Sequence, residues 1–300
     1  MLSKEDNQLL TRVGPGTPMG DLLRQYWIPV VLSEELMEPD GAPMRVRLLG
    51  EDLILFRDTS GRPGLLADHC PHRGASLFFG RNEEDGLRCV YHGWKFDVTG
   101  RCVDMPNEPP ESNFKDKVRQ RAYPCREHGG MIWAYMGPRA NPPELPRVEW
   151  AFVPPEQRNL SPVLRECNWV QALEGDIDTA HLYFLHARLN PDEERGPQND
   201  QGVFHEDRHP RLFLTDTPYG LMYGAQRDEG PDHYYWRITQ FMFPFHTFFP
   251  PGGFVGVPGH IWVPIDDNNT MAWSVAWNPI DPIVLRAGGQ GANGVGFLPS

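Results

Sequence analysis

Long apolar runs are absent from this 300-residue chain, and none approaches the roughly 18 residues that a membrane-spanning helix needs. The N-terminus also lacks the basic-then-apolar pattern of a secretory signal peptide, so we expect a cytoplasmic protein without a membrane partner. Basic residues are few, since 28 lysines and arginines stand against 40 acidic residues and give a net charge of −12. Because nucleic-acid phosphates repel an acidic protein, this charge disfavours a nucleic-acid partner.

Cysteines are few and odd in number. In a chain without a secretion signal, such a count disfavours a disulfide framework and favours metal binding or a reactive role. The five are Cys70, Cys89, Cys102, Cys125 and Cys167. His69, His72 and His92 lie close to the first two in sequence, whereas the other three cysteines have no partner at a metal-ligand spacing. We expect those three to be ordinary apolar residues.

Glycine and proline are abundant, with 30 and 31 residues, and this favours short strands and turns over a helical bundle. Residues 44–136 predict a series of short strands separated by glycine-containing turns. A proline-rich stretch over residues 138–155 marks a domain boundary. Apolar residues at a 3.6-residue period then predict a helix over residues 168–188, and strand patterns return after residue 212.

These patterns predict an α+β protein with two domains. Residues 1–145 are expected to form an N-terminal segment and an all-β domain. Residues 146–300 are expected to form an antiparallel sheet with a helix laid on it.

Two short motifs combine cysteine with histidine, namely Cys70-Pro-His72 and, after sixteen intervening residues, Cys89-Val-Tyr-His92. A glycine follows each histidine closely and permits the tight backbone of a loop tip. Four such ligands suit a tetrahedral zinc ion or a Rieske [2Fe–2S] cluster, in which two cysteines bind one iron and two histidines bind the other. The order of cysteine before histidine in both loops favours the cluster, because each loop then gives one ligand to each iron.

The residues around these ligands, Cys-Pro-His-Arg-Gly and Cys-Val-Tyr-His-Gly-Trp-Lys-Phe, resemble the Rieske oxygenase family. The extra cysteine pair of respiratory-chain Rieske proteins is missing, since the chain has Ala75 and Tyr91 at those places. The resemblance implies that an all-β Rieske [2Fe–2S] domain holds its cluster with Cys70, His72, Cys89 and His92.

A second constellation lies on the predicted helix, where Asp178, His181 and His186 form a D-x2-H-x4-H pattern. Asp178 and His181 are three residues apart and share a helix face, and Glu174 precedes them on the same stripe. The two histidines lie five residues apart, roughly 140° around an ideal helix, so both bind one metal only if the helix bulges or ends between them. Two imidazoles and one carboxylate are the ligand set of mononuclear non-haem Fe(II) oxygenases.

The stretch Asn168–His186 resembles the catalytic-iron motif of Rieske oxygenase large (alpha) subunits, in particular of the phthalate 4,5-dioxygenase-like branch. The resemblance implies a helix-grip, START-like catalytic domain in which His181 and His186 bind the mononuclear iron. It also implies that Asp178 orients one of them and meets a Rieske histidine of the neighbouring subunit.

The third iron ligand of the family is an aspartate further downstream. Asp266 and Asp267 are too early and are typical of a hairpin turn, and Asp281 is typical of an Asp-Pro turn. The chain ends in a glycine-rich stretch over residues 287–296. We therefore expect a catalytic domain that is C-terminally incomplete.

By the same resemblance, the protein takes electrons from a flavin and iron–sulfur reductase, which receives them from NAD(P)H. It uses O₂ at the mononuclear Fe(II) to hydroxylate a small aromatic substrate, with cis-dihydroxylation of phthalate or another aromatic acid as the expected reaction. Monooxygenation and O-demethylation are alternatives within the class, and a homotrimer or a multiple of it is the expected assembly. An alternative from another class is a Rieske electron-transfer protein without a complete catalytic iron site.

Arginine suits a substrate carboxylate, because its planar guanidinium pairs with the two oxygens at once. Arg227 and Arg237 lie in the aromatic-rich part of the chain after residue 210 and are the candidates for this contact.

Overall fold

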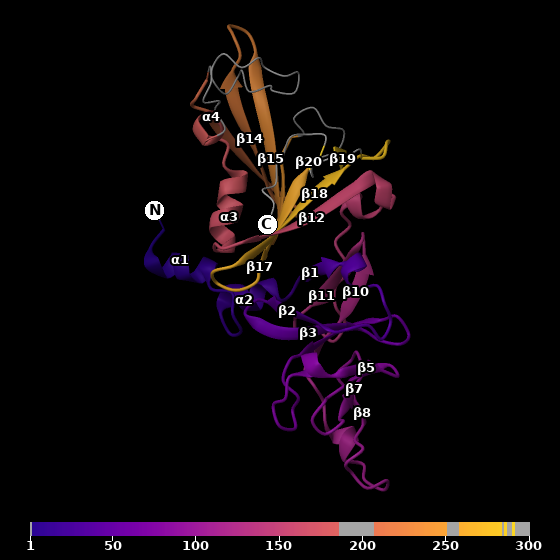
Figure 1. The fold of residues 1–300 in the computed structure, drawn as a ribbon. Helices are drawn as coiled ribbons and strands as arrows, with labels where there is room; N and C mark the ends of the chain where they lie inside the picture. The colour runs from indigo at the N-terminus through magenta and orange to yellow at the C-terminus, as the bar shows by residue number, and fades with distance from the viewer. Residues whose placement is uncertain (1, 186–206, 251–257, 284, 287–289, 292–300) are drawn as a thin grey trace. The chain divides into compact units, whose positions relative to one another are not determined.

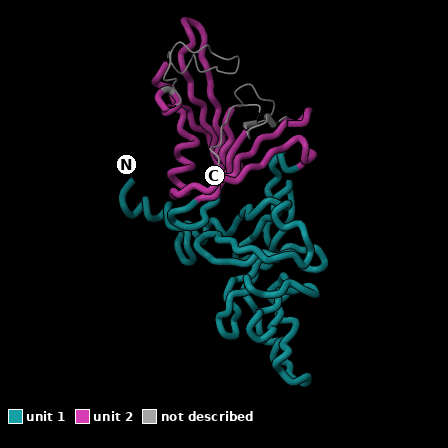
Figure 2. Tube along the Cα trace, viewed as in Figure 1, with its two compact units in different colours: residues 1–151, 263–269 teal, residues 152–262, 270–300 magenta. Residues whose placement is uncertain are grey.

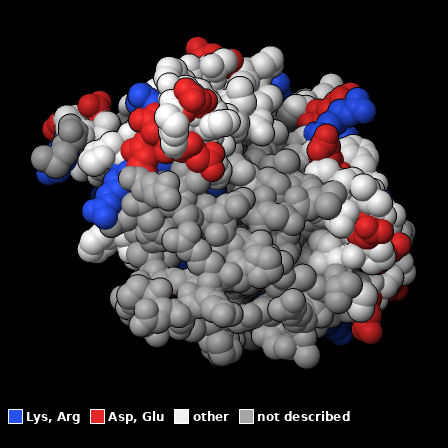
Figure 3. Space-filling model, turned by 90° about the horizontal axis from the view of Figure 1, so that it is seen from above, with Lys and Arg blue, Asp and Glu red and all other residues white. Residues whose placement is uncertain are grey.

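The computed structural model describes residues 2–185, 207–250, 258–283, 285–286 and 290–291. The chain forms two compact units, one of residues 1–151 with 263–269 and one of residues 152–262 with 270–300 (Figure 2). The first unit thus extends past the expected boundary at residue 145 and takes in a second stretch of chain. No helix within the described residues is long and apolar enough to cross a membrane. One face of the molecule shows both acidic and basic side chains on its described part (Figure 3).

The first unit begins with two capped helices. The Ser3 side chain accepts a hydrogen bond from the Asp6 N–H, and Thr17 accepts one from the Gly20 N–H, which stabilises the free donors at each helix start. The helices of this unit, with its short 3-10 helices, are α1 (Lys4–Thr11), α2 (Pro18–Leu23), η1 (Ser33–Leu36), η2 (Leu77–Phe79), η3 (Phe114–Lys117) and η4 (Glu149–Ala151).

Three small antiparallel sheets make up the rest of the first unit (Figure 1). Their strand orders are β1-β11-β10, β2-β3-β4-β9 and β5-β6-β7-β8. The strands are β1 (Trp27–Leu32), β2 (Met44–Leu48), β3 (Glu51–Arg57), β4 (Pro63–Ala67), β5 (Arg81–Glu83), β6 (Gly86–Arg88), β7 (Lys95–Phe96), β8 (Cys102–Asp104), β9 (Ala122–Tyr123), β10 (Cys125–His128) and β11 (Met131–Tyr135). The predicted series of short strands over residues 44–136 is therefore confirmed.

The stretch 263–269 belongs to the first unit although it lies late in the sequence. The N–H groups of Leu49 and Gly50 donate to the carbonyls of Pro264 (3.2 Å) and Ile265 (2.8 Å). Asp267 forms an ion pair with Arg12 at 3.0 Å. The tip of a late hairpin thus completes the packing of the first unit.

The second unit is built on one seven-stranded antiparallel sheet with the order β12-β18-β17-β16-β15-β14-β13. Helix α3 (Trp169–Ile177) packs against β15 and β16 of this sheet, so the predicted sheet with a helix laid on it is confirmed. The other elements are η5 (Pro155–Gln157), β12 (Arg158–Arg165), α4 (Leu182–Leu185), β13 (Arg211–Thr217), β14 (Gly220–Asp228), β15 (Tyr234–Met242), β16 (His246–Phe248), β17 (Gly259–Pro264), β18 (Thr270–Trp277), β19 (Leu285–Arg286) and β20 (Gln290–Gly291).

The prediction of one continuous helix over residues 168–188 is wrong, because α3 ends at Ile177. The backbone of Asp178 is extended (φ −68°, ψ 134°), and its carboxylate accepts hydrogen bonds from the N–H groups of Ala180 (2.8 Å) and His181 (3.0 Å). An aspartate that bonds the backbone just ahead of it competes with helical hydrogen bonding. The helix therefore stops at this residue, and the short α4 begins only after His181.

Candidate metal centres

The two loops that carry the cysteine–histidine motifs have the same hydrogen-bonding pattern. In the first, the Cys70 N–H donates to the Ala75 carbonyl (2.9 Å) and the Gly74 N–H donates to the Cys70 carbonyl (2.9 Å). In the second, the Cys89 N–H donates to the Trp94 carbonyl (2.8 Å), and the Gly93 N–H donates to the Cys89 carbonyl (3.1 Å). The two motifs therefore form a pair of equivalent turns.

A left-handed residue closes each turn. Gly74 has φ +71° and Gly93 has φ +75°, a region that residues with a Cβ rarely adopt. A Cβ at Gly93 would also lie 2.6 Å from the Pro106 Cγ, whereas a Cβ at Gly74 would meet nothing within 4 Å. The turns that present the four predicted ligands thus depend on glycine, as the sequence predicts.

The two cysteines form the buried side of this site. Cys70 and Cys89 are each 3% exposed and pack in one core with Leu77, Leu87 and Trp94. Burial raises the pKa of the Cys70 thiol to about 11, with the neighbouring Cys89 adding to the effect and the N–H groups of His72 and Arg73 opposing it. The raised pKa keeps the Cys70 thiol protonated at neutral pH unless a metal stabilises its thiolate.

The two histidines lie beside each other at the outer side of the site. The ring centroids of His72 and His92 are 4.4 Å apart, and the indole of Trp94 stacks on His72 at 4.3 Å with an interplanar angle of 7°. The Nδ1 atom of His72 is buried without a hydrogen-bond partner in the described part of the chain. Two adjacent thiols, two adjacent imidazoles and one buried nitrogen without a partner fit a [2Fe–2S] cluster of the Rieske type.

Residues outside the motif brace the first loop. The side-chain amide of Gln120 donates to the carbonyls of Ala67 (2.6 Å) and His69 (2.9 Å), and Ser76 donates to Asp68 at 2.5 Å across the base of the loop. His69 thus contributes its backbone carbonyl to this bracing. Among the described residues, no group of three or more His, Cys, Asp and Glu side chains could hold one metal ion. A two-iron cluster takes only two side chains on each iron.

The second candidate centre is the break between α3 and α4. The Nδ1 atom of His181 lies 3.0 Å from the Asp178 Oδ2 atom, and the same carboxylate accepts from the backbone of the break. Burial raises the pKa of Asp178, but the hydrogen bonds from Ala180 and His181 outweigh it and lower the pKa below its usual range. The carboxylate is therefore ionised at neutral pH and holds the imidazole in one orientation.

The sheet fixes the carbonyl groups on either side of Asp178. The Tyr223 hydroxyl donates to the Ile177 carbonyl, and the guanidinium of Arg227 donates to the Thr179 carbonyl (3.0 Å) and hydroxyl (3.2 Å). Arg227 is 1% exposed, and burial lowers its pKa. A structural contact thus accounts for Arg227, one of the two predicted substrate residues. Arg237 lies on the neighbouring strand opposite Ala225 and is half-buried.

The other residues considered for the second centre are one histidine and the aspartates late in the chain. His186 lies outside the described residues. Asp266 accepts hydrogen bonds from the N–H groups of Asn268 and Asn269, both at 2.9 Å, which confirms the predicted hairpin turn. Asp267 accepts from Arg12 and Val13 in the first unit.

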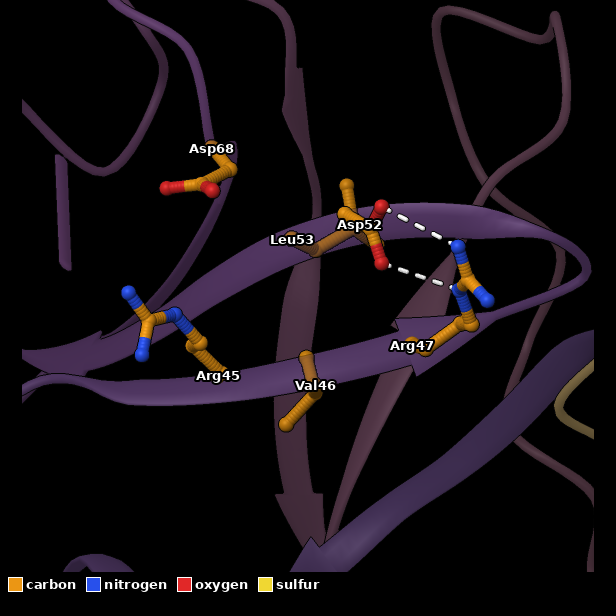
Figure 4. A pocket seen from close by; sticks show the side chains of 6 residues that line it. All are labelled: Arg45, Val46, Arg47, Asp52, Leu53 and Asp68. Atoms are coloured by element: carbon orange, nitrogen blue, oxygen red, sulfur yellow. Dashed lines mark hydrogen bonds and ion pairs between the residues drawn. The ribbon is translucent and has the colours of Figure 1, made fainter. Parts of the chain in front are cut away.

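A pocket of about 380 Å³ lies on the first unit (Figure 4). It is lined by Arg45, Val46, Arg47, Asp52, Leu53 and Asp68. Arg47 forms a bidentate ion pair with Asp52 (2.9 and 3.2 Å). The guanidinium carbon of Arg45 lies 3.7 Å from the centre of the Phe78 ring. None of the six lining residues belongs to the predicted metal centres.

Comparison with protein-family models assigns both parts of the chain. The model described as the Rieske [2Fe-2S] domain matches residues 26–124, and the model described as LigXa C-terminal domain like matches residues 134–284. The second match covers half of the chain and includes the Asp178–His181 pair.

Curated relatives carry the likeness along most of the chain. The chain is 46% identical over 279 residues to the oxygenase subunit of 3-chlorobenzoate-3,4-dioxygenase from Comamonas testosteroni, covering 92% of the chain and 64% of the relative. It is 44% identical over 287 residues to the oxygenase subunit of phthalate 4,5-dioxygenase from Pseudomonas putida, covering 93% and 65%. It is 41% identical over 281 residues to the oxygenase subunit of 5,5'-dehydrodivanillate O-demethylase from Sphingobium, covering 92% and 63%. The chain thus spans a little under two thirds of the length of these relatives.

Solved structures with the same fold are more distant in sequence. Dicamba monooxygenase superposes with a TM-score of 0.61 at 21% identity, covering 84% of this chain and 77% of that one. An oxygenase of carbazole 1,9a-dioxygenase, solved in complex with ferredoxin, superposes with a TM-score of 0.62 at 20% identity, covering 86% and 72%. Both confirm the expected order of an all-β domain followed by a sheet-dominated one.

Proposed function

Because the chain belongs to the Rieske oxygenase family, in the branch with a LigXa-like C-terminal domain, we propose that it is the oxygenase component of a system that hydroxylates an aromatic ring with O₂. One observation carries the proposal: the same chain holds a cysteine–histidine pocket for a cluster and an aspartate–histidine pair in its second unit. An electron carrier needs only the first of these sites.

The four proposed ligands in the first unit differ in their burial. Cys70 and Cys89 are buried and would exclude water from their side of a bound cluster, while His72 and His92 would hold its other iron. When bound, the cluster would supply electrons one at a time, and His181 and His186 would hold a mononuclear Fe(II) that would supply the chemistry of O₂ activation. Electrons come from NAD(P)H through a flavin and iron–sulfur reductase.

Asp178 is the bridge between the two centres in this proposal. Its carboxylate keeps one oxygen for Ala180 and shares the other with His181, and its side chain is 43% exposed. The exposed side supports the proposal that Asp178 accepts a hydrogen bond from a cluster histidine of a neighbouring copy. The proposed assembly is a homotrimer or a multiple of it. An ionised Asp178 fixes the orientation of the His181 ring through its contact with the Nδ1 atom.

The substrate in this proposal is an aromatic carboxylic acid, as the names of two relatives suggest. Arg237 is the residue that meets its carboxylate, because Arg227 already donates to Thr179. Two electrons, two protons and one O₂ convert the ring to a cis-diol, so both oxygen atoms enter the product. Monooxygenation or O-demethylation is the second candidate, since relatives at 41% and 39% identity are named for those reactions.

The test combines metal content with product analysis. The purified protein should hold about three irons and about two acid-labile sulfides per chain. With a surrogate reductase, NAD(P)H and a panel of aromatic acids, ¹⁸O₂ should place two labelled atoms in the product of a dioxygenase and one in that of a monooxygenase. A red-brown protein with two irons per chain that turns over none of the panel would establish the electron carrier instead.

A further inference from the structure

The last turn of α3 carries a second aspartate that the motif does not use. Asp176 accepts hydrogen bonds from the His260 Nδ1 atom (3.0 Å), from the Trp262 Nε1 atom (3.1 Å) and from the Thr247 hydroxyl. The Trp262 Nε1 atom is also 3.1 Å from the Thr247 hydroxyl oxygen, so the donors form a connected group. The side chains of Asp176 and His260 are only 13% and 20% exposed.

This placement of a carboxylate is unfavourable unless it is compensated. Burial removes the water that stabilises its charge, and the C-terminal end of a helix carries a partial negative charge of its own. Burial alone would raise the pKa of Asp176, but the hydrogen bond and charge of His260, with Thr247 and Trp262, lower it instead. The sheet therefore provides three hydrogen-bond donors to the Asp176 carboxylate.

The contacts of Asp176 continue along the chain into the break. Ile177 and Thr179 are bonded to Tyr223 and Arg227 of β14, while Asp176 is bonded to β16 and β17. Asp178, between them, turns its carboxylate to the chain that follows. The strands thus hold the residues on both sides of Asp178 and leave Asp178 itself for His181.

We propose that Asp176, through its pair with His260, is a positioning residue that sets the Asp178–His181 pair in place before iron binds. This inference rests on the proposed function for the role of that pair. The physical reason is preorganisation: a ligand whose support is already fixed loses little conformational entropy when the metal binds. Substrate and cofactor do not touch Asp176, which acts only through the helix end.

The test replaces Asp176 by asparagine, which keeps the shape and removes the charge. In the metal-free protein, amide hydrogen exchange at Ala180 and His181 should accelerate on the order of ten-fold, because a lost bond to a charged group weakens the local structure. Fe(II) affinity at the second centre should fall, and kcat should fall with KM for the aromatic substrate unchanged. The absorption spectrum of the cluster should stay as in the parent.

A matched control is Asp58→Asn. Asp58 is fully buried in the first unit, where it accepts from the Arg62 N–H and side chain, both at 2.7 Å. This variant loses a buried carboxylate of the same kind, yet exchange at Ala180 and His181 should stay at the parent rate. Equal acceleration in both variants would mean a general loss of stability and would overturn the proposal.

A second variant, His260→Gln, keeps the carboxylate and removes its imidazole partner. If the pair acts as one unit, the double variant Asp176→Asn with His260→Gln should be no worse than either single variant. Additive effects, or unchanged exchange and Fe(II) affinity in a folded Asp176→Asn protein, would contradict the inference. Failure of the proposed function has a different signature, since Fe(II) affinity would then be the same in the parent and in His181→Ala while the exchange effect of Asp176→Asn remained.

Discussion

The imidazole of His72 and the indole of Trp94 lie face to face, with centroids 4.3 Å apart and planes within 7°. The Trp94 Nε1–H donates to the Asn107 side chain at 2.8 Å, so the indole is fixed and fixes the imidazole in turn. The Nδ1 atom of the stacked His72 ring is buried and has no hydrogen-bond partner among the described residues, so it is available to a metal. The orientation of His72, a proposed cluster ligand, thus depends on a residue outside the proposed ligand set.

Trp94→Ala should therefore reduce cluster occupancy as well as stability. Removing a buried indole costs about 3–5 kcal/mol, and the freed His72 ring loses its orientation. Iron and sulfide content per folded chain should fall. Trp150→Ala is the control, because Trp150 is 1% exposed in the same unit. It should lower stability similarly while folded molecules keep their cluster, and equal cluster loss would rule out a specific role for Trp94.

The two loop glycines should differ in their tolerance of alanine. Gly74→Ala meets open space and is opposed only by its positive φ, which amounts to about 1–2 kcal/mol. Gly93→Ala meets the same strain and a contact of 2.6 Å with Pro106. We expect Gly93→Ala to lose much more of the visible absorption of the cluster. Equal absorption in the two variants would show that Pro106 moves aside.

Asp178→Asn should leave both metal centres loaded and stop electron transfer between them. Asparagine keeps the shape of the aspartate but loses the carboxylate charge that orients each contacting imidazole. The reduced cluster should then hardly reoxidise when substrate and O₂ are added, as stopped-flow absorption would show. Mixing this variant with a cluster-free His72 variant should restore some activity in hybrid oligomers, if electrons cross between copies. Normal turnover by Asp178→Asn alone would end the bridging role.

Arg227 and Arg237 should respond differently to glutamine. Arg237→Gln should raise KM for an aromatic acid on the order of ten-fold, with little change for an uncharged analogue. Arg227→Gln should lower stability and kcat for both substrates, because Thr179 loses its donor. An equal rise in KM for acid and analogue in Arg237→Gln would exclude contact with the carboxylate.

The buried His246 should make the second unit sensitive to acid. Burial lowers its pKa from 6.5 to about 3, and neither ring nitrogen has a partner among the described residues. Below pH 6.5 the imidazole binds a proton in the unfolded chain but not in the folded chain. The free energy of unfolding therefore has its full value above pH 6.5 and decreases as the pH falls toward 3. The loss by pH 5 is about 2 kcal/mol.

Urea unfolding at pH 8 and pH 5 measures this effect. In His246→Phe the free energy of unfolding should fall less between pH 8 and pH 5, because the substitution removes the titrating group. His233→Gln, at an exposed position, should retain the loss seen in the parent. A parent and a His246→Phe protein with the same pH dependence would show that other groups govern acid unfolding.

Local patterns in the sequence predict the two turns of the first candidate centre, because each loop carries its cysteine, its histidine and its glycine within five residues. Spacing also predicts the pairing of Asp178 with His181. The helix break was missed because apolar periodicity does not register an aspartate that bonds the backbone ahead of it. Nothing in the sequence links Asp176 to His260, since the contact joins residues 84 positions apart and only the sheet brings them together.

The hairpin tip at residues 263–269 has a consequence for the order in which the protein is made. The cysteine–histidine loops leave the ribosome early, yet the N–H groups of Leu49 and Gly50 await acceptors at Pro264 and Ile265. Vectorial synthesis thus begins the first unit first and finishes it only after nearly all of the sheet of the second has emerged. A fragment cut at residue 151 reproduces the early intermediate of synthesis, not the mature unit.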